Sequence, residues 1–278
     1  MKKIILTAAL AASLSIPARA SLVACWNLEE GSGTSTTELT GSTVSDAFGA
    51  GVTWNTTSTA GVASMASLDF TGATTARFGV NENAQDVGVG GTNAKTIVAW
   101  INTSAASSGT TRYFWGWSPS NGMTNGGDLR FGVQNGGLRF EVTGGAATNT
   151  ASLVNDGNWH MVAAVIDAGD TISTIQFYLD GSLIAATGNT SQSINTIATG
   201  AGTASNPNEF FIGSNGNGTA NNWIGGIDDV RIYDTALTGV ELDGIRTAMA
   251  TAVPEPSSAS LILGAAGLCL LARRRRRS

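Results

Sequence analysis

Hydrophobic and polar residues alternate along most of the chain in short segments that glycine, asparagine and aspartate interrupt. Such segments are typical of β-strands, because successive side chains of a strand point to opposite faces of its sheet. In one of them, Ile175, Phe177 and Leu179 share a face. The pattern predicts strands at 22–27, 66–70, 96–102, 113–117, 128–134, 138–143, 159–167, 172–179, 182–186, 209–212 and 227–233.

Three local signals add to this pattern. Asn135-Gly136 and Asp180-Gly181 supply the positive φ angles of a type I′ turn, so each predicts a tight hairpin. Thr238 and Glu241 have the spacing of a capping box, which predicts a short helix after Thr238. Segment 159–166 is apolar on both faces and is therefore expected in the interior of a sheet. With no regular alternation of strand and helix, the fold class expected is all-β: a two-sheet antiparallel sandwich of the jelly-roll type.

The N-terminal 20 residues have the three parts of a secretory signal peptide. Lys2 and Lys3 precede an apolar run over 4–16, and Ala18-Arg19-Ala20 has the small residues of a cleavage site. We expect a short signal helix that is removed after Ala20, which leaves a mature chain that begins at Ser21.

The C-terminal end combines Pro254-Glu255-Pro256, an uncharged apolar run over 259–272 and five arginines at 273–277. The apolar run has 14 residues, whereas a permanent transmembrane helix needs about 20. A short apolar helix that inserts only transiently into the inner membrane is expected, with the arginines on the cytoplasmic side. The predicted organisation is a signal peptide (1–20), one β-sandwich domain (21–250), and a linker with a tail signal (251–278).

The charge of the predicted domain excludes one class of partner. The whole chain has 15 basic and 20 acidic residues, but eight of the basic residues lie in the two terminal segments. The domain keeps seven basic and 19 acidic residues, a net charge of −12. Such a surface does not attract nucleic acid.

The single cysteine of the domain, Cys25, is expected to be a buried small residue and not part of a disulfide framework.

Catalytic carboxylates of a glycoside hydrolase lie about 5 to 10 Å apart, which on one strand requires acids at alternate positions. No strand carries such a pair; Asp228 and Asp229 are adjacent, and an extended strand would point them to opposite faces. The sequence leaves open whether two acids from different strands meet.

His160 is the only histidine, which excludes a zinc site built from several histidines. We expect it to be packed at the start of its strand, and we predict that the protein is not an enzyme.

One aromatic cluster is a candidate binding site. Tyr113, Trp115 and Trp117 would line one face of a regular strand, and exposed rings can stack on sugars. The alternative is that these rings fill the core of the sandwich, and the sequence favours this alternative.

Seven segments occur in the order found in laminin G-like domains of the concanavalin A-like lectin/glucanase superfamily. They read LVACWNLEEGSG, SLDFTG, TIVAWINTS, DGNWHMVAAVID, IQFYLDGSLIA, FIGS and WIGGIDDVRIYDTALTGVEL, and the resemblance covers nearly all of 21–246. The resemblance implies a two-sheet jelly roll in which the first and last strands are paired. It also implies a calcium site formed by an acid in the loop after the first strand and by the acid pair of the last strand. Here these residues are Glu38, where the family usually has aspartate, and Asp228.

The tail resembles the PEP-CTERM sorting signal of Gram-negative bacteria, through Pro254-Glu255-Pro256, the apolar run and the terminal arginines. This resemblance implies recognition by an exosortase, processing near Pro254-Glu255-Pro256, and delivery to the cell surface or extracellular matrix.

These observations predict a non-catalytic, exported surface or matrix protein that binds glycan or another matrix polymer. Two alternatives stay open. One is a polysaccharide-degrading glycoside hydrolase of the same fold, and the other is a purely structural surface component.

Overall fold

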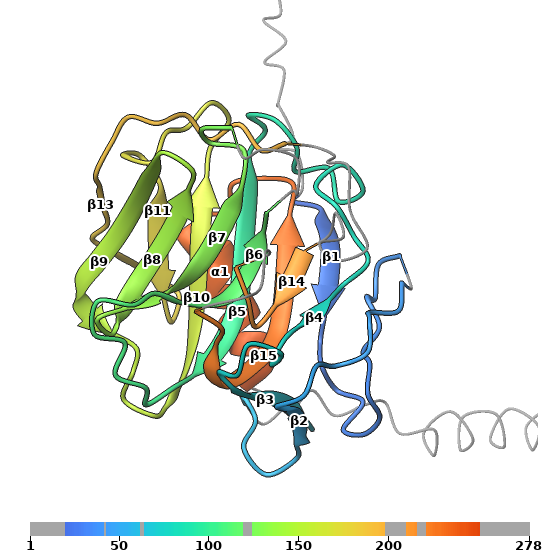
Figure 1. Cartoon of the computed structure of the whole chain (residues 1–278). Helices are drawn as coiled ribbons and strands as arrows, with labels where there is room; N and C mark the ends of the chain where they lie inside the picture. The colour runs from blue at the N-terminus through green and yellow to red at the C-terminus, as the bar shows by residue number, and fades with distance from the viewer. Residues whose placement is uncertain are drawn as a thin grey trace, which may run out of the picture.

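The computed structural model describes residues 20–41, 43–61, 64–118, 124–197, 210–215 and 221–250. Over these ranges the chain forms two antiparallel β-sheets that pack face to face, with one short helix (Figure 1). This is the all-β sandwich that the sequence predicts. The predicted signal helix and the tail at 251–278 lie outside the described residues, and within them no helix has the length and apolar character needed to cross a membrane.

The larger sheet has eight strands, in the order β12-β11-β10-β5-β15-β3-β2, with β1 also paired to β15. Strand β15 is central, because one of its edges pairs with β5 while the other pairs first with β3 and then with β1. The predicted pairing of the first and last strands is confirmed. The strands are β1 (Leu22–Trp26), β2 (Val52–Asn55), β3 (Ser67–Thr71), β5 (Lys95–Asn102), β10 (Trp159–Ile166), β11 (Gln176–Leu179), β12 (Ser182–Ile184) and β15 (Ile224–Tyr233).

The second sheet has seven strands, in the order β13-β9-β8-β7-β6-β14-β4. Its longest part is the meander from β6 to β9, in which consecutive strands are neighbours. The strands are β4 (Phe78–Gly79), β6 (Arg112–Trp117), β7 (Leu129–Gln134), β8 (Gly137–Val142), β9 (Gly145–Leu153), β13 (Thr187–Gly188) and β14 (Phe210–Ile212).

Every predicted strand segment contains a strand, but the sequence pattern missed β2, β4, β9 and β13. Strand β9 has the sequence GAATNTASL, whose small and polar residues lack the alternation of large apolar side chains that marks a strand. Strands β4 and β13 have only two residues each, too few for any pattern to show.

The predicted turns and the predicted cap are confirmed. Asn135 and Asp180 have φ angles of 52° and 50°, and the glycines that follow them are also in the left-handed region, as a type I′ turn requires. Helix α1 (Gly239–Ala250) begins after Thr238, whose hydroxyl accepts a hydrogen bond from the Glu241 backbone N–H at 3.3 Å. The Glu241 carboxylate accepts one in return from the Thr238 backbone N–H at 2.8 Å.

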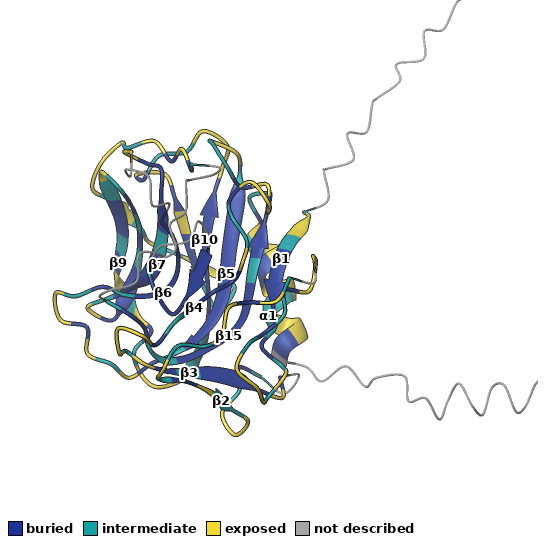
Figure 2. Cartoon of the chain, turned by 45° about the vertical axis from the view of Figure 1, so that its right-hand side comes forward, coloured by how far each residue is buried: buried dark blue, intermediate teal, exposed yellow. Residues whose placement is uncertain are grey.

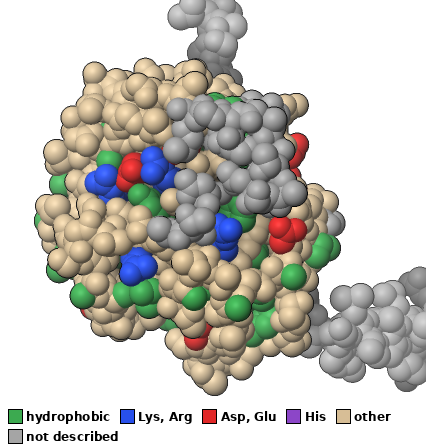
Figure 3. Space-filling view, in the orientation of Figure 1, with side chains coloured by type: hydrophobic (Ala, Val, Ile, Leu, Met, Phe, Trp, Pro, Cys, Tyr) green, Lys and Arg blue, Asp and Glu red, His purple; other side chains and the backbone are tan. Residues whose placement is uncertain are grey.

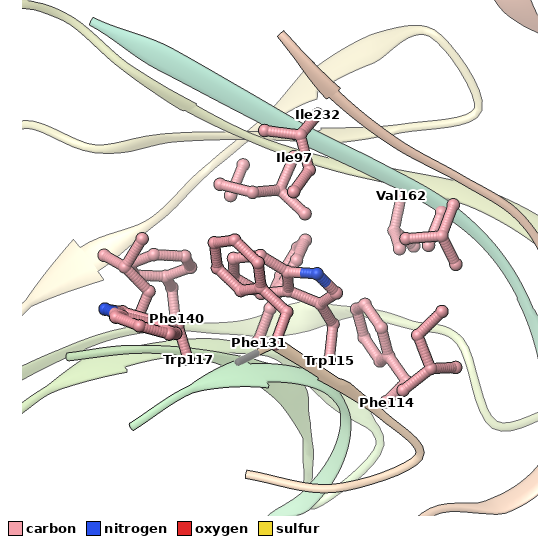
Figure 4. Close-up of a cluster of buried hydrophobic side chains, with 14 of the residues drawn as sticks. Ile97, Phe114, Trp115, Trp117, Phe131, Phe140, Val162 and Ile232 are labelled. Carbon is pink, nitrogen blue, oxygen red and sulfur yellow. The ribbon is translucent and has the colours of Figure 1, made fainter. Parts of the chain in front are cut away.

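Apolar side chains pack on both faces of the eight-stranded sheet. Accordingly, most residues of its strands β5 and β10 are buried (Figure 2). The main core lies between the two sheets, where Trp115, Phe131 and Phe140 point toward Ile97 and Ile232 (Figure 4). A smaller cluster covers the outer face of the eight-stranded sheet and includes residues of β5, β10 and α1. Strand β10 contributes to both clusters, which explains why segment 159–166 is apolar on both faces.

Candidate functional site

A group of charged side chains lies on the outer face of the seven-stranded sheet. Side chains of β7 and β8 alternate between the core and this face, and Arg130 lies directly opposite Glu141 in the antiparallel register. Arg139 lies two residues before Glu141 on the same strand and therefore points to the same face. We call Arg130, Arg139, Glu141, Tyr113 and Asp128 the paired-arginine cluster.

Ion pairs and hydrogen bonds connect all members of the paired-arginine cluster. The Glu141 carboxylate lies 2.9 Å from Arg130 Nη1 and 2.8 Å from Arg139 Nε, and it accepts a hydrogen bond of 2.9 Å from the Tyr113 hydroxyl. On its other side, Arg130 Nε lies 2.7 Å from Asp128 Oδ2. The Arg130 guanidinium also lies over the Tyr113 ring, 6.0 Å from its centroid. These contacts hold both guanidinium groups in fixed orientations.

The Glu141 carboxylate is ionised at neutral pH. Burial opposes the ionisation of Glu141, but Arg130 and Arg139 outweigh this effect and lower the pKa of its carboxyl group. Burial, together with the charge of Glu141, raises the pKa of Tyr113, which therefore stays protonated and donates its hydrogen bond. A carboxylate whose pKa is lowered is a poor general acid near neutral pH.

A surface cavity of about 340 Å³ adjoins the cluster. Arg130, Arg139 and Glu141 line one part of it, and residues 142–146 with Asn189 line the rest. Basic and acidic side chains lie side by side on this face of the molecule (Figure 3). The cavity is therefore a small site with fixed charges at one wall.

The structure separates the three aromatic residues that the sequence grouped. The register between β6 and β7 shifts between Tyr113 and Trp115, so a β-bulge inserts Phe114 into the strand. Tyr113 consequently faces outward into the paired-arginine cluster, while Trp115 and Trp117 point into the core with no exposed surface. The prediction of one shared face was wrong, and the rings of Trp115 and Trp117 fill the core, as the alternative interpretation held.

A second bulge changes the expected geometry of the acid pair in β15. Asp228 lies opposite Trp100 and Arg231 lies opposite Val98, so both point to the outer face of the eight-stranded sheet. Asp229, with a φ of 45°, lies in the register shift between them, and its carboxylate accepts a hydrogen bond of 2.8 Å from Arg231. Both aspartates are thus on the same face, and the prediction that they point to opposite faces was wrong.

Both acids of this pair are fully buried. Burial raises the pKa of Asp228 to about 8, although its carboxylate accepts hydrogen bonds from the Ser64 hydroxyl at 2.8 Å and the Ala60 backbone N–H at 3.2 Å. Burial likewise raises the pKa of the neighbouring Cys25 thiol to about 12, in agreement with its predicted role as a buried small residue.

The two acids expected to bind calcium have different partners. Glu38 is buried, and its carboxylate accepts hydrogen bonds from the backbone N–H groups of Cys25 and Thr40 at 2.7 and 2.8 Å, and from that of Gly41. Burial opposes its ionisation, but these hydrogen bonds together lower the pKa of Glu38. Within the part of the chain that the structure describes, no group of three or more His, Cys, Asp or Glu residues is arranged to hold a metal ion. Calcium at Glu38 and Asp228 stays a prediction.

His160 is the second residue of β10, and its ring lies between two carboxylates. Its Nδ1 is 2.9 Å from Asp180 and its Nε2 is 3.1 Å from Asp156. The hydrogen bond with Asp180 raises the pKa of the imidazole, against the opposing effect of burial. Asp180, in the turn between β11 and β12, also accepts a hydrogen bond from the backbone N–H of Met161, so the histidine helps to hold this turn against β10.

Sequence reasoning missed Arg130, Arg139, Glu141 and Asn189 as site residues. A signal for three of them was present. The Asn135-Gly136 turn joins Gln134 to Gly137, and counting back along both strands from this turn places Arg130 opposite Glu141. No such signal exists for Asn189, which reaches the cavity from a distant segment.

Two family models match the chain. The first, a laminin G-type model of the concanavalin A-like lectin/glucanases superfamily, matches residues 81–243, which is more than half of the chain. The chain belongs to this superfamily. The PEP-CTERM protein-sorting motif matches residues 252–277, so this superfamily domain is followed by a sorting motif. No curated protein matches the chain at a significant level.

Solved structures similar to the chain include three whose names indicate binding to, or action on, another molecule. Domain 4 of AbnA, a GH43 extracellular arabinanase from Geobacillus stearothermophilus solved with arabinotriose, is 16% identical with a TM-score of 0.56; the match covers 82% of this chain and 98% of the domain. The binding domain of Paraclostridial Mosquitocidal Protein 1 is 15% identical (TM-score 0.52; 81% and 51% covered). Trypanosoma rangeli sialidase is 16% identical (TM-score 0.54; 83% and 33% covered).

The chain therefore spans about half of the mosquitocidal binding domain and a third of the sialidase. At these identities the similarity shows the superfamily fold, and the activities of those proteins remain theirs.

Proposed function

We propose that this protein is an exported, non-catalytic glycan-binding protein, and that the glycan binds in the cavity beside the paired-arginine cluster. The observation that carries the proposal is the cluster itself: two guanidinium groups, 15% and 21% exposed, are held by Glu141 at the wall of a solvent-facing cavity. Pre-organised polar groups at a cavity are typical of ligand sites. The arabinanase domain, solved with a sugar, lends support through its fold.

The same geometry argues against hydrolysis at this site. Asp128 and Glu141 come from different segments and flank the same Arg130, so two acids do meet here. The arginines, however, favour the ionised form of Glu141, and Asp128 has no exposed side-chain surface. Hydrolysis requires one carboxylic acid that is protonated and reaches the substrate.

Replacing Arg139 by glutamine tests the binding proposal. Arg139 is on the surface and donates to Glu141, so R139Q removes one charged donor while leaving Arg130 to pair with Asp128 and Glu141. We expect binding to a polysaccharide identified by a glycan-array screen to weaken about 10- to 100-fold, the effect of a hydrogen bond to a charged group. Affinity electrophoresis or calorimetry measures it.

R246Q is the matched control, because Arg246 lies on α1 and, among the described residues, pairs only with Asp243. It should bind like the unaltered protein. Failure to bind any polysaccharide at millimolar concentration, or equal binding by both variants, would contradict the proposal.

The export part of the proposal rests on the sorting motif at 252–277. We propose that an exosortase-type enzyme recognises Pro254-Glu255-Pro256, that the tail inserts transiently into the inner membrane, and that the domain is delivered to the cell surface or extracellular matrix. Replacing these three residues with alanine is expected to leave the full-length protein in the membrane fraction, as measured by fractionation and immunoblotting. Processing that is unchanged in the triple variant would overturn this part.

A further inference from the structure

The polar atoms that line the cavity differ in how far their hydrogen-bonding capacity is used. Both oxygens of Glu141 already accept: Oε1 from Arg130, and Oε2 from Arg139 and the Tyr113 hydroxyl. Asp128 is buried and does not reach a ligand: its Oδ1 accepts a hydrogen bond from the backbone N–H of Thr143, and its Oδ2 lies 2.7 Å from Arg130 Nε in an ion pair. The carboxylates of the paired-arginine cluster therefore have little capacity left to accept a hydrogen bond from a ligand.

The donors of the cavity, in contrast, are only partly used. Arg130 pairs through Nε and Nη1, and Arg139 through Nε and Nη1, so the Nη2 amino group of each has no partner among the described residues. Asn189 is fixed by two hydrogen bonds with Ala146: its Oδ1 accepts at 2.9 Å, and its backbone N–H donates to the carbonyl at 3.0 Å. The Asn189 Nδ2 amino group is thus left as a donor at the same cavity.

An excess of free donors selects against neutral sugars. Each hydroxyl of a neutral sugar carries a hydrogen that must find an acceptor, and a polar group buried without a partner costs free energy. A carboxylate or sulfate only accepts, and guanidinium groups bind such anions with paired, charge-assisted hydrogen bonds. The free groups of this cavity therefore match an anion.

Resting on the proposed glycan binding, we propose that the cavity binds the anionic group, carboxylate or sulfate, of an acidic polysaccharide. Arg130, Arg139 and Asn189 would donate to that group, and Glu141 would hold the arginines in place. The surrounding domain has a net charge of −12, which disfavours unspecific attraction of polyanions. Binding of an acidic polymer would therefore depend on these local donors.

Matched pairs of polymers test the inference with the full-length protein. Polygalacturonate is compared with its methyl ester, and dextran sulfate with dextran, by affinity electrophoresis. We expect at least one acidic polymer to bind about tenfold or more tightly than its neutral counterpart, as the loss of one charge-assisted interaction implies. The pair that shows the difference identifies carboxylate or sulfate as the ligand.

Asn189→Asp is the decisive variant. The aspartate keeps an oxygen that accepts the hydrogen bond from the Ala146 N–H, but it replaces the free amino donor by a second, negatively charged acceptor. Because position 189 is exposed, the substitution should affect folding little. Binding of the acidic polymer should fall about tenfold or more. The control is N155D in the β9–β10 loop, which adds the same charge away from the cavity and should leave this binding unchanged.

If neutral and acidic polymers bind alike and R139Q weakens both, this inference fails while glycan binding stands. If no polymer binds, both proposals fail.

Discussion

Replacing Arg130 by methionine is expected to lower the free energy of unfolding by about 3 to 5 kcal/mol, as when one partner of a buried ion pair is removed. Arg130 Nε lies 2.7 Å from Asp128, whose side chain has no exposed surface, and Nη1 lies 2.9 Å from Glu141. Methionine fills similar space but leaves the Asp128 carboxylate buried without its cation. For a domain of this size the melting temperature should fall by roughly 10 °C.

The double variant D128N/R130M separates lost charge pairing from lost packing. Asparagine keeps an oxygen for the Thr143 backbone N–H but removes the buried charge, so a large part of the stability should return. Arg246, which is partly exposed and pairs with Asp243 on the same helix, provides a control, because R246M should cost less than about 1 kcal/mol. Equal losses for R130M and R246M would show that the paired-arginine cluster contributes little to stability.

Asp228→Asn should make the protein more stable, and more so as the pH rises. Burial raises the pKa of Asp228 to about 8, from 3.8 for an unperturbed aspartate. Between these values the folded protein holds a proton that the unfolded chain has released, so the stability of the unaltered protein falls as the pH rises from about 4 to about 8. Asparagine keeps an oxygen for Ser64 and Ala60 and carries no titrating group.

The gain from D228N should be small at pH 4 and should reach about 2 kcal/mol or more at pH 8.5, since each unit of pKa shift corresponds to about 1.4 kcal/mol. Thermal unfolding at a series of pH values measures this gain. Asp167 is exposed, and D167N serves as a control whose stability should follow that of the unaltered protein. A D228N curve that runs parallel to that of the unaltered protein across this pH range would contradict the assigned burial of the Asp228 charge.

Local sequence signals were sufficient to predict the turns and the helix cap, because the backbone geometry of these short segments depends mainly on their own residues. The type I′ turns at Asn135-Gly136 and Asp180-Gly181 follow from residues that tolerate positive φ, and the cap of α1 follows from Thr238 and Glu241. A two-residue turn also fixes the register of its hairpin, so even the approach of Arg130 to Glu141 is contained in the sequence.

The alternation of hydrophobic and polar residues could not predict the two β-bulges. One extra residue in β6 turns Tyr113 away from Trp115, and a register shift in β15 brings Asp228 and Asp229 to the same face. A strand pattern assumes an unbroken period of two, and a bulge is decided by the neighbouring strand, which the sequence of one segment does not contain.

By itself, the sequence of this protein determined the fold class, the superfamily, the hairpins, and the sorting motif. Only the tertiary structure decided that Trp115 and Trp117 are core residues, that Tyr113 faces outward into the paired-arginine cluster, and that Asn189 faces the same cavity. The physical reason is the range of the interactions. Alternation and turn preference act over a few residues, whereas the cavity is assembled from segments that are distant in sequence and adjacent only after the strands have paired.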